Sequence, residues 1–159
     1  MSPEFLHFAD DGQFPNSRLP AILYRAALDP DPQSMEQHFR QRDWSHSWRN
    51  GVYAFDHYHS TSHEVLGIYQ GRAELCLGGS RVGRSLTVEA GDVLVIPAGV
   101  AHRCVQASQD FQVVGAYAEG RDGDLLRGRP EERPAANQRI AALPLPRQDP
   151  VRGPQGLWS

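Results

Sequence analysis

Residues 51–64, Gly-Val-Tyr-Ala-Phe-Asp-His-Tyr-His-Ser-Thr-Ser-His-Glu, are the stretch that most clearly indicates the fold of this protein. A second informative stretch, residues 91–102, is Gly-Asp-Val-Leu-Val-Ile-Pro-Ala-Gly-Val-Ala-His. Together they contain four side chains whose donor atoms suit first-row divalent metals: His57, His59, Glu64 and His102. The pattern predicts a metal site.

The spacing of these four residues has a physical reason. His57 and His59 alternate with one intervening residue, so an extended backbone places both rings on one face. A bend over residues 60–63 brings Glu64 alongside, and His102 follows a tight turn from another strand. Four protein ligands leave a coordination position open on a metal that prefers five or six ligands. Catalysis by a metal requires such an open position.

The remaining pattern between residues 51 and 120 is one of short strands. Apolar runs at 64–70, 73–77, 85–89, 93–97, 102–106 and 111–118 are separated by Gly-containing turns. Many short strands at close spacing are typical of a sandwich or barrel.

At this point the chain resembles the cupin superfamily, whose motifs are G-x5-H-x-H-x4-E-x6-G and G-x5-P-x-G-x2-H-x3-N. The matching residues are Gly51, His57, His59, Glu64 and Gly71 for the first motif, and Gly91, Pro97, Gly99 and His102 for the second. Gln106 stands where the second motif has Asn. The resemblance covers about residues 51–118 and is closest to small single-domain bacterial cupins of the YjlB-like subgroup.

The resemblance implies an all-β fold, a cupin-type jelly-roll β-barrel with a short N-terminal strand and helix extension. It also implies one divalent transition metal per chain (Fe, Mn, Ni or Zn), held by the four residues above, and a homodimer. We therefore expect an N-terminal extension over residues 1–50, a barrel core over 51–120, and a loop and tail over 121–159 that pack on the barrel or on a dimer partner.

The N-terminal extension is expected to contain one strand and one helix. Residues 20–26 are short and apolar, as in a strand. Residues 34–42 fit a helix with Ser34 as its N-cap and with Met35 and Phe39 on its buried face.

His63 has alternative interpretations. In a motif with one spacer residue fewer, His63 would replace Glu64 as the ligand. Glu64 keeps the six-residue interval to Gly71, so His63 is interpreted as a base at the pocket rim or as a hydrogen-bond partner of a ligand.

Other residues near the predicted metal are expected to line its pocket: Tyr53, Phe55, Cys104 and Tyr117. Cys104 is interpreted as a small core residue, because free cysteine is commonly buried. The stretch 121–133 mixes Arg with Glu and Asp, so it is interpreted as a solvated loop.

Composition excludes several classes of protein. The formal net charge is -3, which does not favour binding to nucleic acid or to an anionic membrane. Only two cysteines are present, no long apolar run occurs and no secretory signal is evident, so we expect a cytoplasmic protein.

Two functions remain open. The first is a metal-dependent enzyme, either a dioxygenase or an isomerase or lyase, acting on a small organic molecule. The second is a non-catalytic barrel that senses or binds a small ligand or a metal. No helix-turn-helix pattern is present, which removes the commonest regulatory form of the second function.

Overall fold

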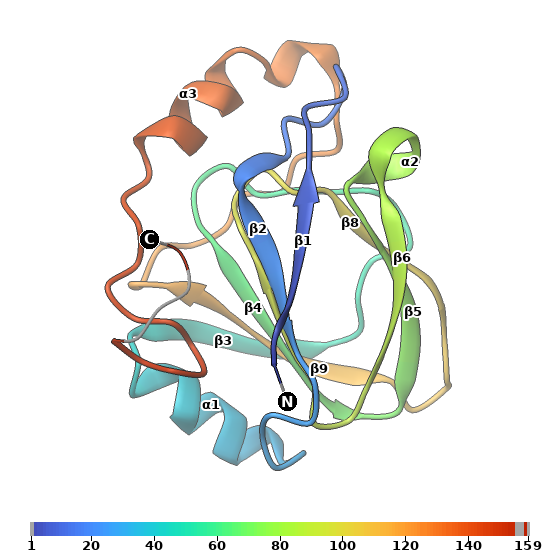
Figure 1. Ribbon diagram of the computed structural model, residues 1–159, viewed down its shortest axis with the longest axis vertical. Coiled ribbons are helices and arrows are strands. Elements are labelled where there is room, and N and C mark those ends of the chain that lie inside the picture. The colour runs from blue at the N-terminus through green and yellow to red at the C-terminus, as the bar shows by residue number, and fades with distance from the viewer. Residues whose placement is uncertain (1, 155–157, 159) are drawn as a thin grey trace.

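Strands dominate the computed structural model, which describes residues 2–154 and 158 (Figure 1). The strands are β1 (Glu4–Phe8), β2 (Ser17–Tyr24), β3 (Trp44–Asn50), β4 (Glu64–Gln70), β5 (Arg72–Leu77), β6 (Arg84–Glu89), β7 (Val93–Ile96), β8 (His102–Ala107) and β9 (Gln112–Ala118). The helices are α1 (Pro32–Arg40), α2 (Gly79–Val82) and α3 (Ala135–Ala142), with a 3₁₀ turn, η1 (Pro130–Glu132). None of the helices in the described residues is long and apolar enough to cross a lipid bilayer.

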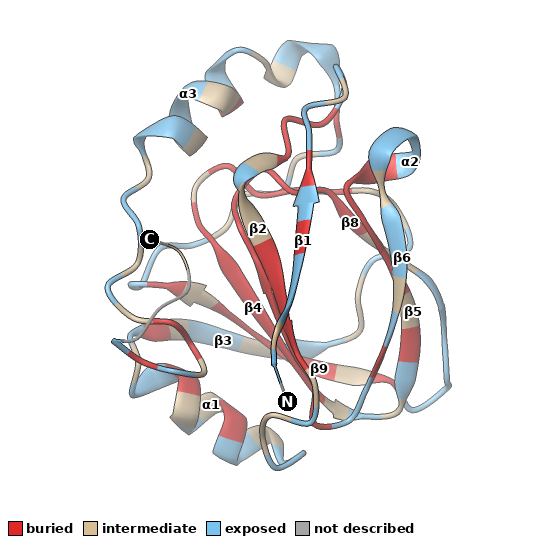
Figure 2. Ribbon diagram, in the orientation of Figure 1, coloured by how far each residue is buried: buried red, intermediate tan, exposed pale blue. Residues whose placement is uncertain are grey.

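The strands form two antiparallel sheets that face each other. The larger sheet has the order β1-β2-β7-β4-β9-β3, and the smaller has the order β6-β5-β8. Apolar side chains from both sheets meet between them, and the buried segments concentrate in β2, β4, β7 and β9 (Figure 2). The predicted all-β, jelly-roll class of fold is therefore confirmed.

The central strand β4 is buried on both of its faces. Leu66 and Ile68 belong to the core between the sheets, whereas Val65 belongs to a second core beneath α1. Because side chains alternate along a strand, Glu64 shares the inner face of Leu66 and Ile68, and His63 lies on the opposite face. This alternation determines which of the two neighbouring residues faces the barrel interior.

Helix α1 covers the outer face of the large sheet with Met35 and Phe39, as the sequence predicts. Its beginning differs from the prediction. Asp31 rather than Ser34 is the N-cap, and its carboxylate accepts the backbone N–H of Ser34 at 2.8 Å. Pro32 then occupies the first turn, where a missing N–H leaves no hydrogen bond unmade.

The N-terminal residues form part of the barrel wall. Strands β1, β2 and β3 all belong to the large sheet, so three of its six strands precede residue 51. The expected extension over residues 1–50 is thus continuous with the barrel core. Alternating burial in the short strand β1, in which Leu6 and Phe8 are buried, was too brief to predict a strand.

The C-terminal segment packs back on the barrel. The indole N–H of Trp44 donates to the carbonyl of Gln148 at 2.9 Å, and the Tyr24 hydroxyl donates to Asp149 at 2.8 Å. The indole N–H of Trp158 donates to the carbonyl of Pro20 at 2.8 Å. These contacts attach the tail to β2 and β3.

Candidate metal centre

His57 and His102 are placed side by side by backbone pairing. Each residue donates its N–H to the carbonyl of the other, at 3.2 and 2.9 Å, as in a short antiparallel bridge. Their ring centroids are 4.1 Å apart. His102 begins β8, but residues 51–63 form no continuous strand, so the extended backbone predicted around His57 and His59 is reduced to isolated bridges at His57 and Tyr58.

Three buried imidazoles converge in the barrel. His57, His59 and His102 each offer a ligand atom, and these atoms all lie within 4.8 Å of one another. The Nδ1–H of His57 donates to the carbonyl of Phe55 at 2.9 Å, and that of His102 donates to Val100 at 3.0 Å. The Nδ1–H of His59 donates to the carbonyl of Asp124.

These anchors determine what the rings can do. An Nδ1 that donates its proton to a carbonyl leaves the lone pair of Nε2 free. In all three histidines Nδ1 is occupied by a backbone carbonyl, so Nε2 is the nitrogen available to a metal, which is the arrangement that metal-binding histidines adopt. The protein therefore orients three imidazole ligands toward one point.

Glu64 completes the group from the first residue of β4. One of its oxygens, Oε1, lies 3.2 Å from Nε2 of His59 and 3.3 Å from Nε2 of His102. Burial alone would raise the pKa of Glu64, but the two histidines hold it below its usual range. Burial would lower the pKa of His59, but the Glu64 carboxylate outweighs this effect and raises it to about 9.

The environment of His57 is different. Burial, followed by the neighbouring His102, lowers the pKa of His57 to about 3, so its ring is neutral at pH 7. The raised pKa of His59 favours a proton on its ring beside the Glu64 carboxylate. A divalent cation would replace that proton, because histidine and carboxylate ligands bind metals in their deprotonated forms.

A loop far along the chain supports His59. The Asp124 carboxylate accepts the backbone N–H of Ser60 at 2.6 Å and that of Thr61 at 3.2 Å. The backbone carbonyl of Asp124 accepts a hydrogen bond from Nδ1–H of His59. A methyl group on the preceding Gly123 would lie only 3.0 Å from the same nitrogen. The loop therefore packs directly against the imidazole that it anchors.

No pattern in the sequence indicates this role for Asp124. Residues 121–133 were expected to form a solvated loop, because their charges alternate and no ligand spacing involves them. Most of these residues are exposed or half-buried, but Asp124 departs from the expectation because its carboxylate binds the backbone amides of Ser60 and Thr61. An Asp-Gly-Asp stretch downstream of the last strand was the available signal, but nothing in the sequence pairs it with residues 59–61.

An open cavity of about 430 Å³ leads to the four residues. Besides them, its lining consists of Trp48, Arg49, Asn50, Gly51, Val52, Tyr53, Leu66 and Tyr117. Tyr53 lies at the mouth, 55% exposed, with its ring 5.2 Å from that of His57. Burial and the Glu64 carboxylate raise the pKa of the Tyr117 phenol, so it keeps its proton at neutral pH.

Two predicted pocket residues do not line this cavity in the described part of the chain. Phe55 stacks on Tyr53 at 4.8 Å and lies beneath the guanidinium of Arg127 at 4.0 Å. Cys104 packs against the core between the sheets. The extended backbone that would have placed Phe55 on the same face as His57 is absent over residues 53–56, which explains the position of Phe55.

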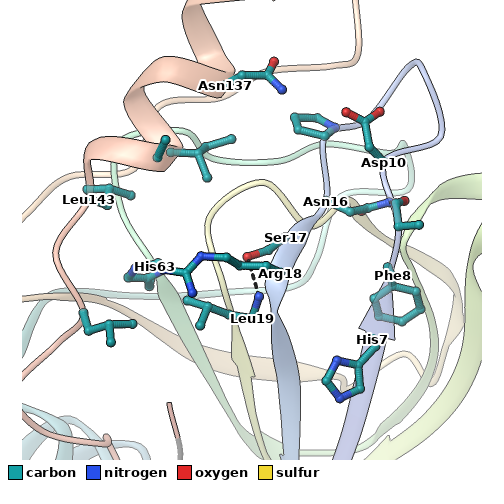
Figure 3. A pocket seen from close by; sticks show the side chains of 15 residues that line it. His7, Phe8, Asp10, Asn16, Ser17, Arg18, Leu19, His63, Asn137 and Leu143 are labelled. Atoms are coloured by element: carbon teal, nitrogen blue, oxygen red, sulfur yellow. Dashed lines mark hydrogen bonds between the residues drawn. The ribbon is translucent and has the colours of Figure 1, made fainter. Parts of the chain in front are cut away.

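His63 lies apart from the metal residues. Its Nδ1 accepts the backbone N–H of Ala98 at 2.9 Å, and its ring lines a separate cavity on the other side of the large sheet (Figure 3). The structure therefore places Glu64, and not His63, beside the three histidines. This position does not support a role for His63 as a base at the metal pocket.

Comparisons with known proteins agree with this architecture. Residues 48–114 match the family described as "Cupin domain". The chain is 40% identical over 147 residues to "Uncharacterized protein YjlB" of Bacillus subtilis, covering 92% of this chain and 88% of that protein. The chain therefore belongs to the cupin superfamily and is YjlB-like.

Two solved structures show a weaker likeness. Acireductone dioxygenase from Bacillus anthracis, with a cadmium ion in its active center, is 17% identical with a TM-score of 0.43, over 59% of this chain and 62% of that one. An S161A mutant of Bacillus subtilis oxalate decarboxylase OxdC is 18% identical with a TM-score of 0.44, over 79% of this chain and 30% of that one. The chain thus matches less than two thirds of the length of either protein, and no activity follows from them.

Proposed function

We propose that this cupin is a metal-dependent enzyme that acts on a small organic molecule. In this proposal His57, His59, Glu64 and His102 hold one divalent transition metal at the base of the open cavity. The observation that carries the proposal is the anchoring of all three imidazoles through Nδ1, which leaves their Nε2 atoms to face one another beside a carboxylate.

The residues present fit such a metal. Imidazole and carboxylate ligands suit Fe, Mn, Ni and Zn, and one carboxylate offsets part of the charge of a divalent ion. All four residues are buried, so only the cavity gives access to them. When bound, the metal would polarise oxygen atoms of a substrate or activate O2.

The cavity wall favours oxygen chemistry over acid–base isomerisation. Apart from the four proposed ligands, the charged residue of the lining within the described residues is Arg49, and Glu36 pairs with it at 2.7 Å. A second free acid–base pair, which an isomerase would need, is therefore missing from that lining. Val52, Leu66 and Trp48 instead supply an apolar part of the wall.

Two polar groups of the wall are suited to orient a substrate. Tyr117 lies opposite Glu64 in the sheet and keeps its phenol proton, so it can donate a hydrogen bond from Oη. The buried Nε1–H of Trp48 lies near the Tyr117 phenol but makes no hydrogen bond of normal geometry with the residues that the structure describes. A substrate oxygen within the cavity would provide an acceptor, because a buried donor is rarely left unpaired.

The test is the metal content of purified protein by elemental mass spectrometry, combined with oxygen uptake against a panel of diols and thiols. We expect about one metal per chain in the wild type, and less than a tenth of that in His57→Ala and His102→Ala, both still folded. His7→Ala, which changes an exposed histidine, should keep its metal. Full metal occupancy in both ligand variants would refute the assigned site.

Oxygen uptake separates the remaining possibilities. Substrate-dependent uptake with stoichiometric iron would support a dioxygenase, whereas Zn, Ni or Mn without uptake would favour an isomerase or lyase. Binding of panel compounds without turnover would favour the non-catalytic ligand-binding barrel. The homodimer expected from the family resemblance can be tested on the same sample by analytical ultracentrifugation.

A further inference from the structure

A second, larger cavity lies between the N-terminal strands and the C-terminal segment (Figure 3). Its volume is about 760 Å³, within the range of small-molecule sites, and it shares no lining residue with the metal cavity. Its walls come from β1, β2 and the turn between them on one side, and from α3 and residues 143–145 on the other.

His63 contributes a buried donor to this cavity. The ring is 4% exposed, and its Nδ1 accepts the N–H of Ala98, so the ring proton resides on Nε2. Nε2 is buried and makes no hydrogen bond of normal geometry among residues 2–154 and 158, although the backbone of Pro144 lies near the ring. The Trp158 ring packs against His63 with a centroid distance of 4.9 Å, which holds the imidazole in place. An unmatched donor of this kind indicates a missing acceptor.

Two other polar side chains of the cavity, Arg18 and Asn137, can also donate hydrogen bonds. Arg18 is exposed, forms no ion pair with the described carboxylates, and points toward His63 in Figure 3. Asn137 has its side-chain oxygen occupied by the Arg133 guanidinium at 2.8 Å, which leaves its NH2 group free. Asp10, the acid of the lining, is paired with the same guanidinium.

The rest of the surface is apolar. Leu19, Ile140, Leu143 and Leu145 line the cavity, and Leu145 remains 40% exposed. Donors at a cationic end beside apolar walls are complementary to an organic anion with a hydrophobic body. A purely apolar ligand would leave the His63 donor unsatisfied, and a hydrophilic anion would leave the leucines in contact with water.

We propose that this cavity is a second ligand site, separate from the metal centre, which binds an organic carboxylate that carries an apolar chain. The carboxylate accepts hydrogen bonds from His63 Nε2 and the Arg18 guanidinium, and the chain lies against Leu19, Leu143 and Leu145. This inference does not depend on the proposed enzymatic function, because none of the proposed metal ligands lines the cavity.

The test is isothermal titration calorimetry of the full-length protein with octanoate and with octanamide, a neutral molecule of the same chain length. We expect octanoate to bind at least about tenfold more tightly, because hydrogen bonds to a charged group contribute about 1.5–3 kcal/mol. Arg18→Gln should weaken octanoate binding about tenfold and leave octanamide binding unchanged. Arg84→Gln removes the same charge from β6, outside the cavity, and should bind as the wild type does.

Two further variants make the result decisive. His63→Asn keeps an acceptor for the Ala98 N–H but removes the Nε2 donor, and should also weaken octanoate binding about tenfold. His57→Ala changes the metal centre and should keep full octanoate affinity. Equal affinity for octanoate and octanamide, unchanged binding in Arg18→Gln, or loss of binding in His57→Ala would each overturn the proposal.

Discussion

Gly123→Ala tests whether the loop of residues 121–126 controls the metal centre. A methyl group built on Gly123 would lie 2.7 Å from Cε1 of Tyr117 and 3.0 Å from Nδ1 of His59. The backbone at this position is not left-handed, so alanine itself brings no backbone strain. The substitution therefore acts through these two contacts.

The size of the effect follows from the distances. Ordinary van der Waals contact of a Cβ begins at 3.4 Å. Reaching it requires a movement of about 0.7 Å relative to Tyr117 and about 0.4 Å relative to His59, from 3.4 minus 2.7 and 3.4 minus 3.0. Metal ligands tolerate displacements of only about 0.2 Å, and loss of a hydrogen-bond partner of a ligand lowers metal affinity about 10–100-fold.

Either way of relieving the contact has the same consequence. If His59 moves, its Nε2 leaves the proposed metal position. If the loop moves, the Asp124 carbonyl withdraws from His59 Nδ1. We therefore expect the metal dissociation constant to rise about 10–100-fold, equivalent to about 1.4–2.7 kcal/mol. The midpoint of thermal unfolding of the metal-free protein should also fall, because the contact with Tyr117 overpacks this site.

The assay is a competition titration of Zn²⁺ against a chromophoric chelator. Gly51→Ala is the matched control, because Gly51 also borders the metal cavity but a methyl group there meets no atom within 4 Å. Its metal affinity should equal that of the wild type. Wild-type affinity in Gly123→Ala, or an equal loss in both variants, would refute the reasoning from contact distances.

Two further predictions concern stability. Gly67→Ala would place a methyl group 2.9 Å from Met35 Sδ and 3.0 Å from Phe39 Cζ. This overpacking beneath α1 should lower the free energy of unfolding, measured by urea denaturation, by about 1–3 kcal/mol. An unchanged urea midpoint would contradict this prediction. Burial and Asp149 raise the pKa of Tyr24 in the folded state. The folded protein therefore keeps a phenol proton that the unfolded chain loses above about pH 10. Above that pH the free energy of unfolding of the wild type should fall by at most about 1.4 kcal/mol per pH unit. Tyr24→Phe should be about 1–3 kcal/mol less stable than the wild type at pH 8, because Asp149 loses its buried hydrogen-bond partner. This difference in the free energy of unfolding should narrow from pH 10 to 11. A difference that stays constant over this range would contradict the raised pKa of Tyr24.

Much of the fold was predictable because it depends on local patterns. Apolar alternation and Gly-containing turns predicted the strands between residues 64 and 118, and the pair Met35 and Phe39 predicted the buried face of α1. The helix start was misplaced by the choice of Ser34 over Asp31, since both residue types cap helices equally well. Strand β1 was missed because five residues carry too little periodicity to distinguish a strand from a loop.

The sequence by itself determined the spacing that brings three histidines and one carboxylate to neighbouring positions, because strand alternation and tight turns act over a few residues. Only the tertiary structure decided that the ring of His59 is anchored by Asp124, that Phe55 turns away from the metal cavity, and that His63 faces a second cavity. These features join residues far apart in the chain, such as β2 with the C-terminal segment and residues 59–61 with 122–124. Such contacts depend on the path of the folded chain, which leaves no periodic signal in the sequence.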